Sequence, residues 1–329
     1  MQYKAITFVK RPIADITADT FELVTLETPV LKDGEFLVKQ THMSLDPAMR
    51  TWMQDNPNSY IPPIAIGEVM RSFGVGEVVE SKNPAFPVGA RVIGNTGWAE
   101  YVLGGADMQV VPHDLPVEAL MCVLHVPGLT AYVGLFEVLR PKAGETLVVS
   151  GAAGSVGSLV GQMAKAEGLR VIGIAGSDEK CRWLEDELGF DRAINYRSAN
   201  LAEQLAEAAP NGVDIYFENT GGPIQQVVFE RMNRFGRITV CGMIADYNRE
   251  VPAPGPSWVD INLKALRVEG FVIVDHYDKA PKAVEVLTGY LQKGQIKYRA
   301  HVLQGLESAI EGVNLLFNGD NQGKLLVEL

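Results

Sequence analysis

Two kinds of hydrophobic pattern divide this chain of 329 residues. In roughly the first 120 residues, short apolar runs are separated by proline and glycine, which predicts an irregular antiparallel β domain. From about Ala143 apolar runs alternate with segments of helical spacing. That alternation predicts an α/β domain with a doubly wound parallel sheet. The β-like runs of the first region lie at 35–39, 76–80, 91–93 and 99–102.

In the second region, six strands and the helices between them can be placed. The expected strands lie at 146–150, 170–175, 192–195, 213–218, 237–242 and 267–274. Helices are expected at 178–188, closed by Gly189, at 223–234, closed by Gly236, and at 279–292. The tail then offers a strand near 298–303, a helix near 305–317 and a strand at 324–328. We expect the tail to return to the first domain, which gives 1–122 with 304–329, and 123–303.

Composition narrows the class of protein. The chain is 47% hydrophobic and 21% charged, as in an ordinary globular protein, and its length suits about two domains. Its net charge of −11 repels nucleic acid and anionic membranes, so we expect a small-molecule partner, with no nucleic acid and no membrane. No basic segment precedes an apolar one at the start, and we find no apolar run near ~18 residues. We therefore expect a cytoplasmic protein.

The cysteines and histidines do not form a ligand pattern. Cys122, Cys181 and Cys241 are far apart, and three is a poor number for a disulfide framework. The five histidines show no paired helical spacing. We predict reduced thiols and no metal.

The strongest chemical signal is a glycine-rich turn. An apolar strand at 146–150 leads into Gly151, Gly154 and Gly157, and apolar residues then follow at helical spacing. Free N–H groups at such a helix start, together with the helix dipole, suit a phosphate. Gly154 would let the chain approach a pyrophosphate, and Gly157 would let the helix pack against the strand. Glycines also serve ordinary turns, but the flanking strand and helix favour a dinucleotide site.

The next strand indicates which dinucleotide binds. NAD sites usually carry an acid about 20 residues past the glycines, and here Gly176 stands at that place. Ser177 is a good helix cap, which puts Lys180 in the first turn, where a cation opposes the helix dipole. A bound 2′-phosphate would offset that conflict, so we predict NADPH. Asp178 argues against this reading, and a solvated surface lysine is the alternative.

An ordered set of motifs then resembles one family. The motifs lie at 45–50 (LDPAMR), 67–70 (GEVM), 126–132 (VPGLTAY), 151–157 (GAAGSVG), 177–180 (SDEK), 195–196 (NY), 217–222 (FENTGG), 241–248 (CGMIADYN) and 319–324 (GDNQGK). With them the chain resembles zinc-independent medium-chain dehydrogenase/reductases. It is most similar to the NADPH-dependent alkenal/one reductases, the group of the prostaglandin and curcumin reductases. The resemblance implies a Rossmann cofactor domain, a GroES-like domain and a homodimer paired through the cofactor domain. An apolar strand at 268–274 would extend the sheet across the two-fold axis, and a core strand without a free edge is the alternative.

The resemblance also implies cofactor residues position by position. Gly154, Ser155, Val156 and Gly157 would meet the pyrophosphate, and Lys180 and Tyr196 the 2′-phosphate. Asn219 and Asn321 would contact NADPH, although turn chemistry alone can explain Asn321. The remaining implied contacts, on the nicotinamide side, are Cys241, Gly242, Tyr247, Phe271, Val272 and Ile273. For the last three, plain sheet core is the alternative.

The implied reaction is hydride transfer to the β-carbon of an enal or enone, followed by protonation of the enolate. A donor aimed at the carbonyl oxygen would lower the barrier. Tyr60, in a proline-braced loop, is our candidate, and a tyrosine packed against prolines is the alternative. The chain departs from the family at Leu263, where other members have a tyrosine, and at His125, where glycine is common.

Two other functions stay open at this point. One is an NADPH:quinone oxidoreductase of the same superfamily, since fold does not fix function. The other is a non-catalytic NADPH-binding protein. Cofactor affinity without turnover of any enone or quinone would identify the second.

Overall fold

The computed structural model describes residues 1–329, which form two compact units. Unit 1 contains Met1–Met121 and Ala300–Leu329, and unit 2 contains Cys122–Arg299. The tail therefore belongs with the first unit, as predicted. Its boundary falls earlier than the predicted 303/304, because the strand that begins at Ala300 pairs with the last strand of the chain.

Unit 2 contains the predicted parallel sheet. Its strands are β8 (Thr146–Ser150), β9 (Arg170–Ala175), β10 (Arg192–Asn195), β11 (Val213–Glu218), β12 (Met232–Val240) and β13 (Arg267–Gly270). The order β10-β9-β8-β11-β12-β13 is that of a doubly wound dinucleotide-binding sheet. The order reverses between β8 and β11, and in such sheets ligands bind beyond the carboxyl ends of the strands at that point.

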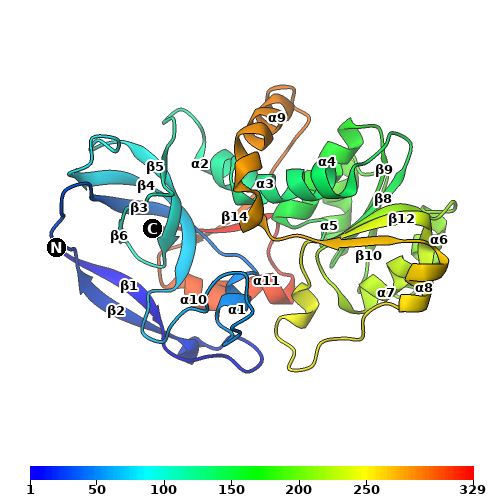
Figure 1. Cartoon of the computed structure of the whole chain (residues 1–329), viewed down its shortest axis with the longest axis horizontal. Helices are drawn as coiled ribbons and strands as arrows, with labels where there is room; N and C mark the ends of the chain where they lie inside the picture. The colour runs from blue at the N-terminus through cyan, green and yellow to red at the C-terminus, as the bar shows by residue number, and fades with distance from the viewer. The chain divides into compact units, whose positions relative to one another are not determined.

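Helices cover both faces of this sheet. Figure 1 shows α3 (Val126–Tyr132) and α4 (Ser155–Ala166) on one side, and α6 (Leu201–Ala208) and α7 (Gly222–Arg231) on the other. On the α6 and α7 side, apolar side chains of these helices pack on the sheet in one buried cluster that includes Val148, Ile172 and Val228. The other helical segments of unit 2 are η3 (Val133–Leu139), α5 (Asp178–Arg182), η4 (Trp183–Glu187), η5 (Ile244–Asp246), α8 (Trp258–Leu263), η6 (Ile273–Lys279) and α9 (Ala280–Gln292).

Two predicted elements of unit 2 end early. The helix predicted to reach 234 ends at Arg231, because Met232 is extended and pairs with Val213 as the start of β12. The strand predicted at 267–274 ends at Gly270, which pairs with Val240, the last residue of β12. Beyond Val240 no neighbouring strand offers hydrogen bonds, so the chain turns into η6.

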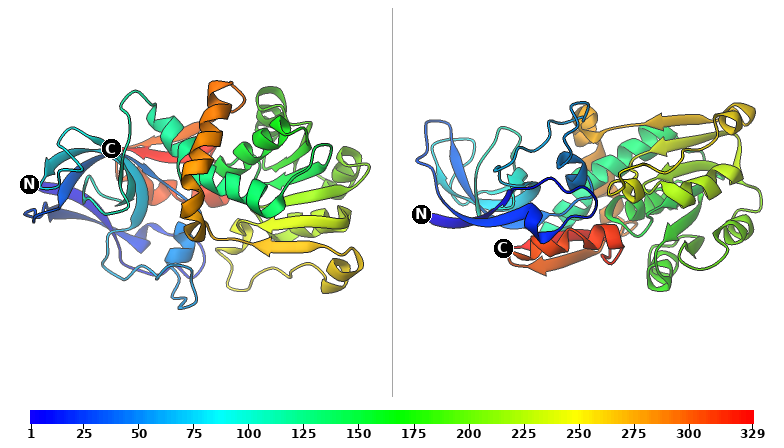
Figure 2. Two further views of the ribbon diagram at one scale, coloured as in Figure 1. Left: turned by 45° about the horizontal axis from the view of Figure 1, so that its top comes forward. Right: turned by 90° about the horizontal axis from the view of Figure 1, so that it is seen from below.

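Unit 1 is mostly antiparallel β structure, as predicted. Its strands are β1 (Gln2–Phe8), β2 (Phe21–Glu27), β3 (Phe36–Ser44), β4 (Arg71–Ser81), β5 (Arg91–Gly97), β6 (Tyr101–Leu103), β7 (Gln109–Val110), β14 (Ala300–Gln304) and β15 (Lys324–Glu328). The C-terminal β15 pairs antiparallel with β3, and Figure 2 shows these red and blue segments together in both views. The β1–β2 hairpin was not among the predicted runs.

The helices of unit 1 are short. They are η1 (Ala18–Thr20), α1 (Met49–Trp52), α2 (Val117–Ala119), α10 (Ser308–Gly312) and α11 (Leu315–Asn318), with η2 (Leu120–Leu124) running across the unit boundary. The single helix predicted near 305–317 is therefore two short ones. Met43, Met49 and Trp98 belong to the main core cluster of this unit.

One helical stretch, from Val117 to Leu139, is long and apolar enough to cross a membrane by length and composition. Our sequence analysis found no such run. Of its most apolar window, 78% is buried inside the structure, as expected for a core helix.

Candidate active site

The glycine-rich turn joins β8 to α4. Gly151 has φ +58°, and Gly154 stands before the first turn of α4, where no side chain caps the helix. The first N–H groups of a helix have no partner within the helix, so they are available to a phosphate. A Cβ on Gly157 would lie 2.5 Å from the Gly151 carbonyl oxygen. Only glycine therefore allows this close packing, as predicted.

The start of α5 has the predicted cap. Ser177 Oγ accepts a hydrogen bond of 3.2 Å from the backbone N–H of Lys180. This places Lys180 in the first turn, beside the end of β9. The Asp178 carboxylate, which argued against a phosphate, accepts a hydrogen bond of 2.8 Å from Asn195 Nδ2. A hydrogen bond from a neighbouring amide thus stabilises the Asp178 carboxylate.

Tyr196 lies against the same turn. A Cβ on Gly176 would be 3.2 Å from the Tyr196 hydroxyl oxygen, so the missing side chain leaves room for the phenol. The Arg197 guanidinium lies 5.8 Å from the centre of the Tyr196 ring. Tyr196 and Gly176 thus lie side by side, and Lys180 and Arg197 follow them closely in the sequence.

The loops after β8, β11 and β12 also meet. Asn219 Nδ2 donates to the Ser150 carbonyl oxygen at 2.7 Å, and the Tyr247 hydroxyl accepts from the Met243 N–H at 3.2 Å. A Cβ on Gly242 would lie 3.2 Å from that hydroxyl and 3.5 Å from the Asn219 carbonyl oxygen. The structure therefore brings Asn219, Gly242 and Tyr247 together at the carboxyl edge of the sheet.

Four predicted contacts of unit 2 remain, namely Cys241 and residues 271–273. The Cys241 N–H donates to the Glu218 carbonyl oxygen at 2.9 Å. Burial, and next the charge of Glu218, raise the pKa of the Cys241 thiol to about 12, so it stays protonated. Residues 271–273 follow β13 and are partly buried, and the Phe271 ring meets His276 edge-on.

Tyr60 belongs to unit 1 and is 41% exposed. Its hydroxyl oxygen accepts a hydrogen bond of 3.1 Å from Trp52 Nε1, and Trp52 is anchored in the core cluster of the unit. Since the indole only donates, the phenol keeps its own hydrogen for another acceptor. The Tyr60 hydroxyl is thus held by a hydrogen bond from the core of unit 1.

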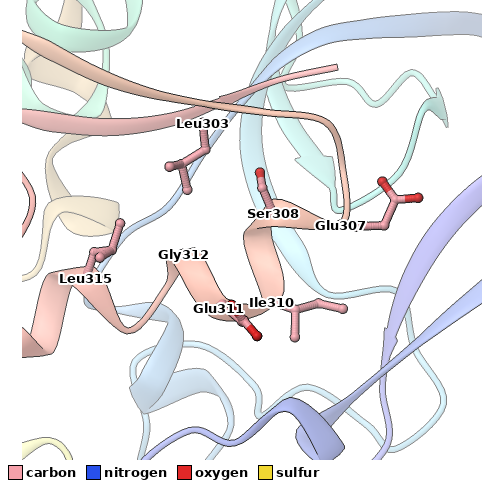
Figure 3. Close-up of a pocket in the computed structure, with 7 residues that line it drawn as sticks. All are labelled: Leu303, Glu307, Ser308, Ile310, Glu311, Gly312 and Leu315. Carbon is pink, nitrogen blue, oxygen red and sulfur yellow. The ribbon is translucent and has the colours of Figure 1, made fainter.

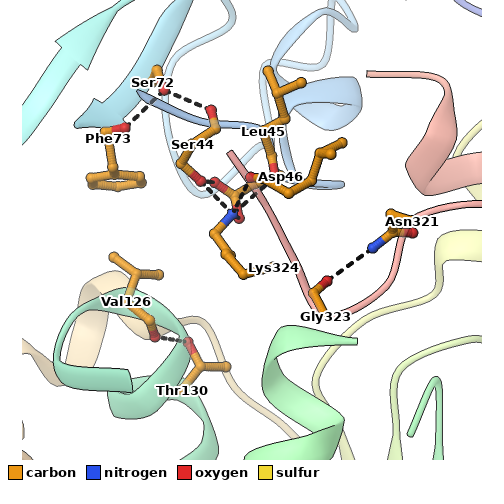
Figure 4. A network of polar contacts seen from close by, with 11 residues as sticks. Ser44, Leu45, Asp46, Ser72, Phe73, Val126, Thr130, Asn321, Gly323 and Lys324 are labelled. Carbon is orange, nitrogen blue, oxygen red and sulfur yellow. Dashed lines mark hydrogen bonds and ion pairs between the residues drawn. The ribbon is translucent and has the colours of Figure 1, made fainter. Parts of the chain in front are cut away.

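Asn321 lies in the turn before β15, where its side chain donates to the Gly323 carbonyl oxygen at 3.0 Å. Directly after this turn, Lys324 is anchored by Ser44, Leu45 and Asp46 (Figure 4). The turn is therefore fixed at one end by a buried cation.

No three His, Cys, Asp or Glu side chains of the chain gather as a metal site. Leu45 is 1% exposed in the core, and Glu68 accepts from the Ala65 N–H at 3.1 Å. A depression of about 450 Å³ in unit 1, around α10, contains none of the predicted site residues (Figure 3).

Comparison with known proteins identifies the family. The family described as the N-terminal domain of oxidoreductase matches residues 4–111, and the family described as zinc-binding dehydrogenase matches residues 155–289. Prostaglandin reductase 1 of Bos taurus is 41% identical over 99% of this chain and 98% of its own. The chain belongs to the zinc-independent medium-chain dehydrogenase/reductase family.

Within this family, the 2-alkenal reductase (NADP(+)-dependent) of Nicotiana tabacum is 40% identical over 89% of this chain and 87% of its own. The crystal structure of CurA in complex with NADPH from Vibrio vulnificus superposes with a TM-score of 0.95 at 39% identity. That superposition covers 99% of this chain and 98% of CurA. The resemblance, the fold and the reductase subgroup expected from the sequence are thereby confirmed.

Sequence reasoning missed three residues that organise the site. Glu218 and Ser150 link the loops at the carboxyl edge, and Trp52 orients Tyr60. Only Glu218 had a signal in the sequence, namely a charge that ends the apolar strand at 213–218.

Proposed function

We propose that this protein uses NADPH to reduce the C=C bond of α,β-unsaturated aldehydes and ketones. The observation that carries the proposal is the pairing of two features. One is, in unit 2, a helix start with free N–H groups at the carboxyl edge of a doubly wound sheet, and the other is, in unit 1, a partly exposed tyrosine held by a hydrogen bond. The relatives named above are a prostaglandin reductase and an NADP-dependent 2-alkenal reductase, in agreement with this reaction.

The cofactor residues are part of the proposal. The N–H groups of Ser155, Val156 and Gly157 bind the pyrophosphate, with Gly154 giving access to it. Lys180 and Tyr196 hold the 2′-phosphate. The proposed groups around the nicotinamide half are Asn219, Cys241, Gly242, Tyr247, Phe271, Val272 and Ile273. Asn321 is also a proposed NADPH contact.

The chemistry follows from these roles. NADPH, when bound, supplies a hydride to the β-carbon. Tyr60 donates a hydrogen bond to the substrate carbonyl oxygen, where negative charge develops, and a proton then reaches the α-carbon of the enolate. Because Trp52 already donates to the Tyr60 oxygen, the phenol O–H is polarised and directed away from the indole.

The test is cofactor oxidation with a small panel, comparing NADPH with NADH. The panel contains a medium-chain 2-alkenal, an aryl enone, a quinone and a simple ketone. We expect turnover of the enal or enone with NADPH, and mass spectrometry should show the saturated carbonyl product. Turnover of the quinone alone would assign the protein to the quinone reductases instead. Tight NADPH binding with no turnover would support the non-catalytic alternative.

A homodimer in the cytoplasm completes the proposal. All four residues of β13 are exposed, and this strand pairs only with β12. An open edge of this kind suits pairing with the same strand of a second copy. Light scattering after size exclusion should give twice the chain mass of 35.8 kDa, and a monomer would contradict it.

A further inference from the structure

Glu218 is a fully buried acid at the carboxyl end of β11. The rest of that strand is largely apolar, and the relative exposure of Glu218 is 0%. A buried carboxylate is costly unless hydrogen bonds stabilise it. Its place, between β8 and β12 at the point where ligands bind in such sheets, makes its partners informative.

One carboxylate oxygen of Glu218 gathers several donors. Oε1 accepts from Ser150 Oγ at 2.7 Å, from the Thr220 N–H at 2.7 Å and from the Gly221 N–H at 3.0 Å. The Thr220 hydroxyl adds a bond of 3.1 Å. None of these donors is charged, and two are backbone groups. The carboxylate therefore fixes the main chain after β11 and the last residue of β8.

Ser150 links the Glu218 carboxylate to Asn219 by hydrogen bonds. Its hydroxyl, which donates to Glu218, accepts from the Asn219 N–H at 2.9 Å. Its carbonyl oxygen accepts from the Asn219 side chain at 2.7 Å. Both the backbone and the side chain of Asn219 are thus held by Ser150, the last residue of β8.

The backbone of Glu218 holds the third loop. Its carbonyl oxygen accepts from the N–H groups of Cys241 at 2.9 Å and Gly242 at 3.2 Å. The side chain and main chain of one residue thus join the loops after β8, β11 and β12. The 2′-phosphate side depends on other contacts, those of Ser177 with Lys180 and of Asn195 with Asp178.

We infer that Glu218 is a positioning residue that pre-organises the nicotinamide side of the cofactor site and leaves the 2′-phosphate side unchanged. The inference rests on the proposed function, because Asn219, Cys241 and Gly242 are its proposed cofactor contacts. Pre-organisation raises affinity by removing the cost of ordering loops on binding.

The experiment compares two ligands on the full chain. Dissociation constants for NADPH and for its fragment 2′,5′-ADP are measured by titration calorimetry, with thermal melting in parallel. Glu218→Gln keeps the volume but removes the charged acceptor, and hydrogen bonds to charged groups are the stronger kind. We expect NADPH binding about tenfold weaker in this variant and 2′,5′-ADP binding within about twofold of the wild type.

Asp214 offers a matched control on the same strand. Near the amino end of β11, its carboxylate accepts from the Thr146 N–H at 2.9 Å and from Asn233 Nδ2 at 2.7 Å. Asp214→Asn should lower the melting temperature without changing either dissociation constant. If Glu218→Gln does not fold, Ser150→Ala removes the hydroxyl link alone and should give the same selective loss of NADPH affinity.

The outcomes separate this inference from the proposed function. A wild-type protein that does not bind NADPH contradicts the proposed function itself. If the wild type binds NADPH and Glu218→Gln leaves its affinity unchanged, the inference is wrong. Equal losses for NADPH and 2′,5′-ADP would also overturn it, because they would show a general structural role.

Discussion

Each unit buries a charged side chain next to a proposed cofactor contact, but the two charges are stabilised differently. Lys324 in unit 1 is 3% exposed, and Glu218 in unit 2 is 0% exposed. Lys324 has a counter-charge, since it donates to Asp46 Oδ1 at 2.9 Å, and it also donates to the Leu45 carbonyl oxygen. Glu218 has only neutral donors, two of them in the backbone.

This difference indicates what each charge does. Lys324 joins the start of β15 to the end of β3, so it locks two strands that are far apart in the sequence. Glu218 lies at the end of its strand and orders loops. We therefore expect a charge paired between strands to contribute mainly to stability, and a charge solvated by loop N–H groups to contribute mainly to ligand binding.

The largest expected effect is on stability, in Lys324→Met. This change removes one partner of a buried ion pair and leaves Ser44 and Asp46 without their cation, which typically costs about 3–5 kcal/mol. Urea unfolding followed by circular dichroism measures the loss. The control is Lys165→Met, whose partner Asp191 lies nearer the surface, and it should cost about 1 kcal/mol or less. Similar losses of unfolding free energy in both variants would contradict the distinction between a buried ion pair and one nearer the surface.

The next effect is on turnover, in Tyr60→Phe. If Tyr60 stabilises the developing enolate, the variant should lose about a hundredfold in kcat, near the lower limit for removing an oxyanion donor. Stability should fall by about 1 kcal/mol, because Trp52 Nε1 loses its acceptor at a part-buried position. Tyr290→Phe is a matched control, since that hydroxyl bonds only Glu167 at the surface of unit 2. Unchanged kcat and kcat/KM for every accepted enone would rule out the role.

A smaller effect is expected on cofactor choice, in Lys180→Ala. Losing a cation that holds the 2′-phosphate should weaken NADPH by about tenfold and leave NADH nearly unchanged. Arg182→Ala, later in the same helix, is the control and should affect neither cofactor. Equal losses for NADPH and NADH would count against the role of Lys180. Like Tyr60, Lys180 tests whether a proposed ligand contact can change with little loss of stability.

Local signals in the sequence were enough for much of the fold and for the turn and the helix cap of the proposed cofactor site. The glycine-rich turn, the Ser177 cap and the alternation of strands and helices each act within a few residues, so the sequence predicts them directly. The ends of α7 and β13 depend on which strand offers hydrogen bonds nearby, and the sequence does not state this.

The partners of the buried charges could not be predicted from the sequence either. Ser150 and Glu218 are 68 positions apart, and Asp46 and Lys324 are 278 apart. A charged residue at the end of an apolar strand is visible in the sequence, but its partner is not. Trp52 is only eight positions from Tyr60, yet its contact depends on how the loop folds back.

The smallest expected effect is on how stability depends on pH. It concerns a carboxylate of unit 2 that, like Lys324, has a partner of opposite charge. Glu145 forms a two-point ion pair with Arg237, with bonds of 2.7 and 2.8 Å, at the amino end of the sheet. Burial alone would raise the pKa of Glu145, but the hydrogen bonds from Arg237 and the Lys142 N–H outweigh it and lower the pKa below its usual 4.5. A carboxyl whose pKa is lowered on folding stabilises the protein above the unfolded pKa, and this contribution is lost as pH falls through the folded value.

We therefore expect Glu145→Gln to be about 1 kcal/mol less stable than the wild type at pH 7, with normal NADPH affinity. The difference should shrink below about pH 4.5 and vanish once the wild-type carboxyl is protonated. Urea midpoints from pH 7 to pH 3 measure this. Glu285→Gln, in a pair whose side chains are 57% and 70% exposed, should show no such trend. A Glu145→Gln variant that instead lost NADPH affinity would contradict the distinction between charges that stabilise the fold and charges that order the loops. A charge in an ion pair, away from the loops, would then also control binding.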